Sequence, residues 1–371
     1  MTAVDVTAIT LWLGVTAYAV FGGADFGGGF WHLAAGTGRE GRRARDLIAD
    51  AIGPVWEANH TWLIFDLEIL WTAFPPAFAA IMSTLFVPLT LAAFGIVLRG
   101  AAFAFRPLAE SPRGQRLADA VFGLSSILTP FFLGAAGGAI ASGRVPAGDT
   151  PGDLVASWIT PTSALVGGLA IAVCAYLAAV FLVADARRLR QPDLERFFLR
   201  RATAAAVVAG GLAVFGIGVL QIDAPILARE LTRTGWPFIV ASGLFGLAAL
   251  VRIRLGARFG TRALAVGAVV AVIWGWGFAQ YPDILPGSLA LADAAAPTGS
   301  LEALLVVFFV AALVIAPSLG LLYYLDQRSR LGGHATPTSP NGGNHGARHV
   351  PSPAASADRR AEEDQTADHR R

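Results

Sequence analysis

Residues 53–63 read GPVWEANHTWL and place a carboxylate, an amide and an imidazole within four positions, at Glu57, Asn59 and His60. The surrounding stretch is apolar enough to cross a membrane, yet it continues with Asp66 and Glu68. Ionisable groups at membrane depth are costly unless they are paired, hydrated or turned toward protein, so they indicate function. Buried carboxylates of this kind suit a proton relay.

Helical spacing divides this segment into two polar faces. At 100° per residue, one face carries protonatable and hydroxyl side chains: Glu57, His60, Thr61 and Glu68. The other face carries an amide, an indole and a carboxylate: Asn59, Trp62 and Asp66. We expect Pro54 to kink the helix, and we expect its own bundle on one side and a second polytopic chain on the other. Polar side chains also join helices by hydrogen bonds, so one face can be purely structural.

Two further ionisable residues lie inside apolar segments. Asp25 follows a glycine pair in GGADFGGG, where it is either a second relay point or a cap for a kinked helix. Glu57 likewise has two possible roles, as a point of the proton relay or as a purely structural residue. Arg99, in VLRGAAFAFR, can pair with a buried carboxylate, contact a lipid or quinone head group, or extend toward the membrane surface.

The elements that position these residues are membrane-spanning helices. Apolar residues make up 55% of the chain and charged residues 15%, against about 25% charged in soluble domains. Nine apolar segments are each long enough to cross the membrane, and they span residues 7–34, 47–73, 76–106, 117–142, 155–185, 198–221, 236–254, 262–281 and 302–325. The sequence therefore predicts an all-α polytopic membrane protein with nine transmembrane helices in residues 1–326. Residues 327–371 are polar and low in complexity, which predicts a disordered tail.

Arginine distribution predicts the orientation. The loops after the first, third, fifth and seventh segments hold most of the arginines, whereas the opposite loops hold only Arg144, Arg229 and Arg233. By the positive-inside rule, the N-terminus is expected outside and the C-terminal tail in the cytoplasm.

Metal and nucleic-acid chemistry are not indicated. The single cysteine, Cys174, excludes a cysteine-held cluster. A transmembrane haem needs two axial ligands, and outside the tail the histidines are only His32 and His60. We therefore expect no metal or haem ligand in this chain, no nucleic-acid surface and no catalytic residue of its own.

Four motifs together resemble subunit II of the cytochrome bd quinol oxidases. They are GADFGGG, GPVWEANHTWL with WTAFPPAFA, VLRGAAFAFR, and WGWGFAQYP with LPG, and the resemblance covers about residues 5–326. It implies a multi-pass subunit of the bacterial cytoplasmic membrane within an enzyme that oxidises quinol and reduces dioxygen to water. Haem b and haem d, or b in place of d, are then expected on a partner subunit I. Small accessory subunits and a bound quinone or lipid are also compatible with it.

The resemblance also implies roles for individual positions. Asp25 and Glu57 match acids of a proton pathway, to which His60 is added here, while Trp62 matches a residue near the proposed dioxygen access. Arg99 matches an arginine expected to contact quinone, lipid or a carboxylate.

This chain departs from the family pattern at three positions. Many members carry aspartate where this chain has Gly22, so one acid is missing. Asp66 and Glu68 replace apolar residues and, with Asn59, predict an additional polar path or a contact with subunit I.

Two alternative functions remain at this stage. A purely structural assembly subunit would need no proton or gas path of its own. A proton-coupled secondary transporter would also place carboxylates at mid-depth, usually in two related halves, although no repeat is visible here.

Overall fold

The computed structural model describes residues 1–52, 56–148, 150–257 and 260–332. The first half of the chain contains α1 (Ala3–Ala17), a π-helical turn (Tyr18–Gly22), α2 (Gly23–Leu33), α3 (Arg39–Ile52), α4 (Trp56–Ala73), α5 (Pro75–Thr84), α6 (Phe86–Phe105), a 3₁₀ turn (Arg106–Leu108) and α7 (Pro112–Ala141). The second half contains α8 (Pro161–Arg188), α9 (Pro192–Asp223), α10 (Pro225–Arg233), α11 (Trp236–Arg254), α12 (Thr261–Gln280), strands β1 (Asp283–Leu285) and β2 (Leu289–Ala290), α13 (Leu291–Ala294) and α14 (Thr298–Gly332). The two strands form one short antiparallel pair.

The prediction of a polytopic helical membrane protein is confirmed. Within the described ranges, eight helices are long and apolar enough to span a membrane, and a bent pair formed by residues 57–73 and 75–84 raises the count to nine if it is one span. The chain separates into the units Met1–Asp326 and Gln327–Arg371, and the packing below concerns the first. The disordered cytoplasmic tail stays a prediction, although α14 continues as far as Gly332.

Two predicted segment boundaries are wrong. The segment predicted at 76–106 is divided at Leu85, and its first part, α5, is bent by 119° from α4 instead of continuing into α6. Leu85 is completely buried in one core cluster with Phe74 and Ile81, and Pro88 in the first turn of α6 has no N–H to donate to the Thr84 carbonyl. Core packing and this proline therefore separate α5 from α6. The segment predicted at 47–73 is divided between α3 and α4, and the predicted kink at Gly53-Pro54 lies outside the described residues.

Prolines define many of the helix beginnings. Pro75, Pro112, Pro161, Pro192 and Pro225 each occupy the first turn of a helix, where the missing N–H would be unpaired in any case. The hydroxyl oxygens of Ser111 and Thr160 also cap α7 and α8 by accepting backbone N–H groups.

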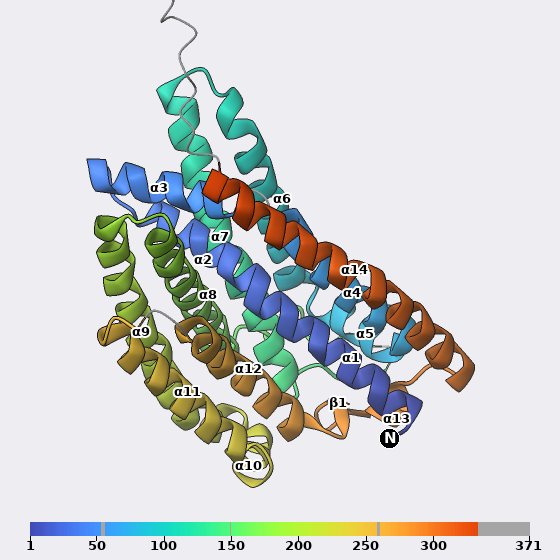
Figure 1. The fold of residues 1–371 in the computed structure, drawn as a ribbon. Helices are drawn as coiled ribbons and strands as arrows, with labels where there is room; N and C mark the ends of the chain where they lie inside the picture. The colour runs from blue at the N-terminus through green and yellow to red at the C-terminus, as the bar shows by residue number, and fades with distance from the viewer. Residues whose placement is uncertain (53–55, 149, 258–259, 333–371) are drawn as a thin grey trace, which may run out of the picture. The chain divides into compact units, whose positions relative to one another are not determined.

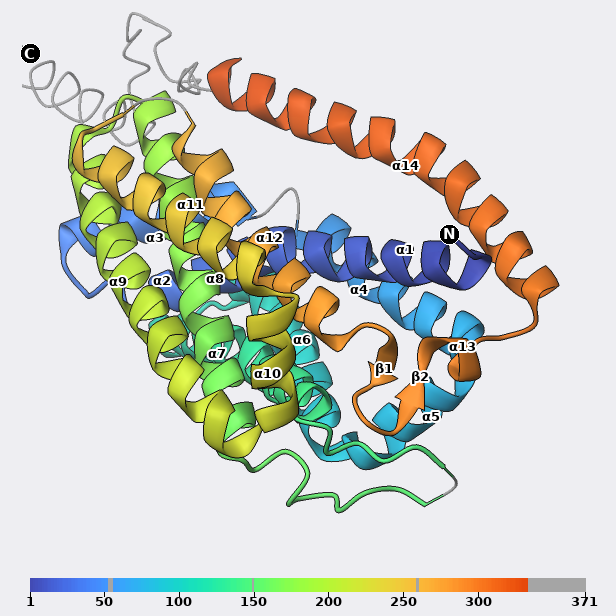
Figure 2. The ribbon, with the colours of Figure 1, turned by 90° about the horizontal axis from the view of Figure 1, so that it is seen from below.

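Helix α2 lies against α7 and α8 in the bundle (Figures 1 and 2). The glycines of GGADFGGG allow this close approach. A Cβ on Gly27 would lie 1.8 Å from the Cys174 carbonyl oxygen of α8, and one on Gly29 would lie 2.0 Å from the Ser126 hydroxyl of α7. Small residues at such crossings let membrane helices pack backbone to backbone.

Ion pairs bring the arginine-rich helix ends together. Arg187 at the end of α8 pairs with Glu195 at the start of α9, and Arg262 at the start of α12 pairs with Asp185 of α8. At the opposite helix ends, Arg144 after α7 pairs with Asp223 at the end of α9. The alternation inferred from the arginine counts is thus reproduced by helix ends that meet in space, while the side that faces the cytoplasm stays a prediction.

Candidate functional site

The site begins at Asp25, in the first turn of α2. Asp25 is only 6% exposed, and its Oδ2 accepts a 2.6 Å hydrogen bond from the Asn59 amide of α4. Asn59 is equally buried and also donates to the Phe21 carbonyl at 3.5 Å. Asp25 therefore links α2 to α4 instead of capping a helix end, since α1, the π-helical turn and α2 run on as one span.

Arg99 of α6 lies beside this pair and is 1% exposed. Its Nη2 donates to the Asp25 carbonyl oxygen at 3.1 Å, and its Nε donates to the Ser126 hydroxyl at 3.1 Å. The guanidinium also lies over the rings of Phe26 and Phe122, with centroids 5.1 and 5.2 Å away, in cation–π geometry. The side chain does not extend to the membrane surface; it joins α2, α6 and α7 and interacts electrostatically with the Asp25 carboxylate.

The π-helical turn brings Tyr18 toward α4. The Tyr18 hydroxyl lies 3.5 Å from Nδ1 of His60, whose ring also packs near Phe26. Single-turn π-helices within α-helices are frequent at functional sites. The Tyr18 ring occupies the space next to Gly22, where an added Cβ would lie 2.8 Å from a ring carbon.

The rest of α4 has one buried and one exposed polar face. Glu57 in its first turn, Thr61 and Glu68 are exposed in this chain, whereas Asn59 and Asp66 are buried. Trp62 is half-buried and packs edge-on against Phe65. The predicted division into two faces is thus reproduced except for His60, which was predicted on the Glu57 face and is half-buried beside Tyr18 and Phe26. Glu57 lies on the face turned away from Asp25.

Asp66 faces α1. It is 9% exposed, and its Oδ1 has no hydrogen-bond partner among the described residues. Oδ1 lies against Gly14, where an added Cβ would be only 1.9 Å away. Gly14 therefore leaves the room that the carboxyl group occupies between α1 and α4.

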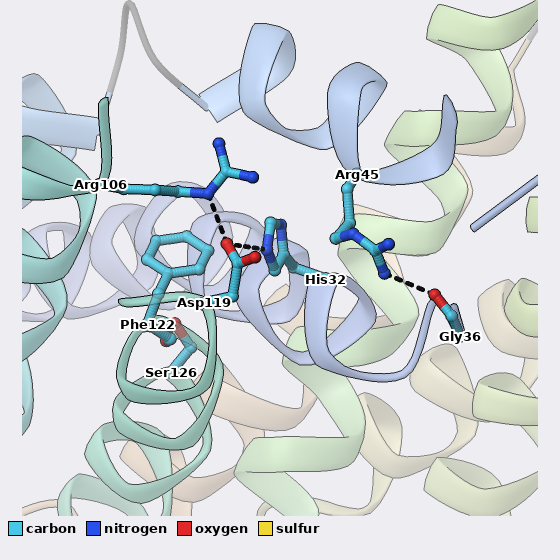
Figure 3. Close-up of polar contacts among 7 residues, drawn as sticks. All are labelled: His32, Gly36, Arg45, Arg106, Asp119, Phe122 and Ser126. Carbon is cyan, nitrogen blue, oxygen red and sulfur yellow. Dashed lines mark hydrogen bonds and ion pairs between the residues drawn. The ribbon is translucent and has the colours of Figure 1, made fainter. Parts of the chain in front are cut away.

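A second polar cluster lies where α2, α6 and α7 meet at their arginine-rich ends (Figure 3). The Asp119 carboxylate of α7 accepts hydrogen bonds from Nε2 of His32, at 3.0 Å, and from Nε of Arg106. Sequence reasoning missed Asp119, Tyr18 and Ser126. Two signals were available: Asp119 is an acid two residues inside a predicted span, and Tyr18 is a tyrosine four residues before the first glycine of the glycine-rich motif.

The structure brings Asp25, Asn59 and Arg99 into one contact network, places His60 at its edge through Tyr18, and leaves Trp62, Asp66, Glu57 and Glu68 outside it. The histidines that could ligate haem have other contacts, since His32 bonds to Asp119 and His60 lies beside Tyr18. In the described portion of the chain, no three His, Cys, Asp or Glu side chains converge on a possible metal position.

Comparison with known proteins points to one family. The family described as cytochrome bd terminal oxidase subunit II matches residues 4–326. Cytochrome bd ubiquinol oxidase subunit 2 of Bacillus subtilis (strain 168) is 31% identical over 112 residues, covering 30% of this chain and 32% of that protein. Cytochrome bd-I ubiquinol oxidase subunit 2 of Escherichia coli (strain K12) is 30% identical over 126 residues, covering 34% of this chain and 32% of that protein. The aligned part thus spans about a third of the length of these relatives.

A solved structure shares the fold over most of the chain. The bd oxidase from Geobacillus thermodenitrificans matches with a TM-score of 0.70 and 24% identity, over 88% of this chain and 98% of that chain.

Proposed function

Because the chain belongs to the cytochrome bd terminal oxidase subunit II family and is a multi-pass protein of the bacterial cytoplasmic membrane, we propose that it is the second subunit of a quinol oxidase. In this proposal it supports a haem-bearing subunit I and lines a proton route to the site of dioxygen reduction. Haem b and haem d, or b in place of d, supply the redox chemistry and belong to subunit I. Its N-terminus lies outside and its C-terminus in the cytoplasm.

The observation that carries the proton route is the buried Asp25–Asn59 pair beside Arg99. A carboxylate enclosed by three helices can hold a proton away from water, and the Asn59 amide fixes its Oδ2 while Oδ1 remains available to carry that proton. The Arg99 charge stabilises the ionised form at the moment when the proton leaves.

Glu57 and His60 form the outer part of the same route. Glu57 lies on the face of α4 that is exposed in the isolated chain, and His60 is half-buried beside Tyr18. In this proposal a proton reaches Glu57 along the contact with subunit I and approaches Asp25 past His60. Trp62 lines the proposed dioxygen access. Asp66 continues the buried polar face of α4, and Glu68 continues the exposed polar face, where it contacts subunit I.

The test is Asp25→Asn in the purified oxidase. Asparagine keeps an acceptor for the Asn59 amide but cannot carry the proton, so we expect quinol-driven dioxygen uptake to fall at least about tenfold with an unchanged haem spectrum. Glu57→Gln should give the same pattern. Glu110→Gln, which alters an exposed acid outside the network, serves as the matched control and should retain full activity.

Dioxygen uptake and the haem spectrum of these variants also distinguish the proton route from the two alternative functions, structural assembly and secondary transport. Loss of the haems or of the complex in Asp25→Asn would assign the carboxylate to assembly, and full activity would refute the proton role. A chain that is stable and active in transport without any haem-bearing partner would support the secondary transporter instead.

A further inference from the structure

A cavity of about 250 Å³ lies where α8, α9, α11 and α12 meet. Helices α8 and α11 end beside it, and α9 and α12 begin beside it, so we place it at a membrane boundary and not in the hydrocarbon centre. This is also the end of the bundle where the arginine-rich loops gather. Its polar lining consists of Arg187, Arg262 and Thr261, and its apolar lining includes Val180, Val183 and Leu199.

The polar lining has more hydrogen-bond donors than protein acceptors. Arg262 donates through Nη2 to the Phe181 carbonyl and the Asp185 carboxylate, at 2.7 and 2.8 Å. Its Nε and the Thr261 hydroxyl are buried, and neither has a hydrogen-bond partner within the described residues. Buried donors without acceptors are unfavourable, so these two groups would be stabilised by an acceptor that enters the cavity and draws them toward it.

The start of α12 adds to this donor excess. The helix begins at Thr261, and its cap, Gly260, has a left-handed φ of 80° and no side chain to accept the N–H groups of the first turn. Unpaired N–H groups at a helix start favour an anion. These N–H groups lie beside the Thr261 hydroxyl and the Arg262 Nε, which have no hydrogen-bond partner among the residues that the structure describes.

The local charge is positive. Asp185 pairs with both Arg188 and Arg262, and Glu195 pairs with Arg187, so two acids balance three arginines. The guanidinium of Arg252 also approaches the cavity, since a Cβ on Gly260 would lie 3.6 Å from its Nη2. A guanidinium group matches a phosphate through hydrogen bonds strengthened by charge.

We propose that this cavity binds the phosphate of an anionic phospholipid, with the start of one acyl chain against Val180, Val183 and Leu199. A soluble phosphate would use the donors but leave the apolar wall exposed to water, whereas a phospholipid satisfies both halves. Basic pockets between transmembrane helices are where anionic head groups bind. The bound lipid would hold the ends of these four helices together.

The experiment counts tightly bound lipids on the purified, delipidated oxidase by native mass spectrometry. Dioleoylphosphatidylglycerol, dioleoylphosphatidylcholine and inorganic phosphate are the three probes. We expect the wild-type protein to retain phosphatidylglycerol about tenfold more tightly than phosphatidylcholine. Ala184→Phe, which fills the cavity without altering charge, should remove one retained phosphatidylglycerol. Thr261→Val should weaken that lipid about tenfold by removing one donor to a charged acceptor.

Arg196→Gln is the matched control, because this arginine is 71% exposed at the same end of α9 and does not line the cavity. It should leave the lipid count unchanged. Equal affinity for the two phospholipids, or an unchanged count in Ala184→Phe, would overturn the proposal. Inorganic phosphate that displaces the retained phosphatidylglycerol at equal concentration would replace the lipid assignment with a soluble-anion site. Thr261→Ser restores the hydroxyl and should restore binding, which separates the donor's role from a folding defect.

Discussion

At the scale of single residues, Arg99 allows the clearest stability prediction. It makes two hydrogen bonds from a charged group and two cation–π contacts, and it is almost fully enclosed. Arg99→Leu removes these bonds and leaves the Asp25 carbonyl and the Ser126 hydroxyl with one donor less. Because each hydrogen bond from a charged group contributes about 1.5–3 kcal/mol, we expect a loss of about 3 kcal/mol or more.

The measurement is the thermal inactivation half-life of the detergent-solubilised oxidase, since large membrane complexes rarely unfold reversibly. Arg99→Leu should shorten the half-life strongly, and Arg99→Lys should do so as well, because an ammonium group cannot make the same forked contacts. Arg113→Gln, an exposed arginine at the start of α7, should have no effect. A half-life in Arg99→Leu equal to that of the wild-type protein would show that the contacts around Arg99 add nothing to stability.

The residues of the site differ in how far the sequence could predict them. Asp25, Asn59 and Arg99 stand out because polar side chains are rare in apolar segments, and the structure brings all three together. Their partners could not be inferred, because the sequence does not say which helices are neighbours: Asp25 is joined to Asn59 across 34 positions and to Arg99 across 74. Tyr18 escaped notice because its approach to His60 depends on the π-helical turn, which no sequence pattern predicts.

At the scale of elements, the crossing of α2 and α8 depends on Gly27. A methyl group there would lie 1.8 Å from the Cys174 carbonyl oxygen and 2.7 Å from the Ala178 Cβ, so the two backbones would have to separate. We expect Gly27→Ala to lower stability by about 3 kcal/mol and to reduce the amount of assembled oxidase in membranes. Gly210→Ala in α9 is the matched control, because nothing lies within 4 Å of its Cβ position and alanine favours a helix. Normal assembly of Gly27→Ala would mean that α2 and α8 can move apart freely.

The residues at the segment ends explain why some elements were predicted and others were not. The span 236–254 matches α11, since prolines and arginines mark its ends clearly. In the apolar run from Pro75 to Phe105, Pro88 lies close to the division at Leu85, but proline also occurs within the continuous helix α7, at Pro130. The proline alone therefore does not predict the division, which also depends on burial of Leu85 in the core. Helix α3 was merged with the second span because Leu47, Ile48 and Ile52 are apolar, although its other face carries arginines.

At the scale of the whole molecule, the outer face of α4 requires a protein neighbour. Glu57, Thr61 and Glu68 are exposed there together with Ile64 and Trp71, which are 66% and 62% exposed. Two carboxylates in a membrane-spanning helix are strongly disfavoured against lipid but are tolerated against protein that pairs or hydrates them. By contrast, the outer face of α9 is apolar, as Val214 and Phe215 show, and suits lipid.

This contrast predicts the result of photocrosslinking in native membranes. Benzoylphenylalanine at position 61 should cross-link to a second, haem-bearing polypeptide, whereas the same group at position 214 should give no polypeptide adduct because it contacts lipid. Position 64 lies on the same face as position 61 and should repeat its result, which guards against a local defect at one site. Cross-links to polypeptide from position 214 but not from 61 or 64 would place the partner against α9. The carboxylates of α4 would then have to be covered by lipid-bound water or by the chain itself, and the proton route through Glu57 would lose its outer end.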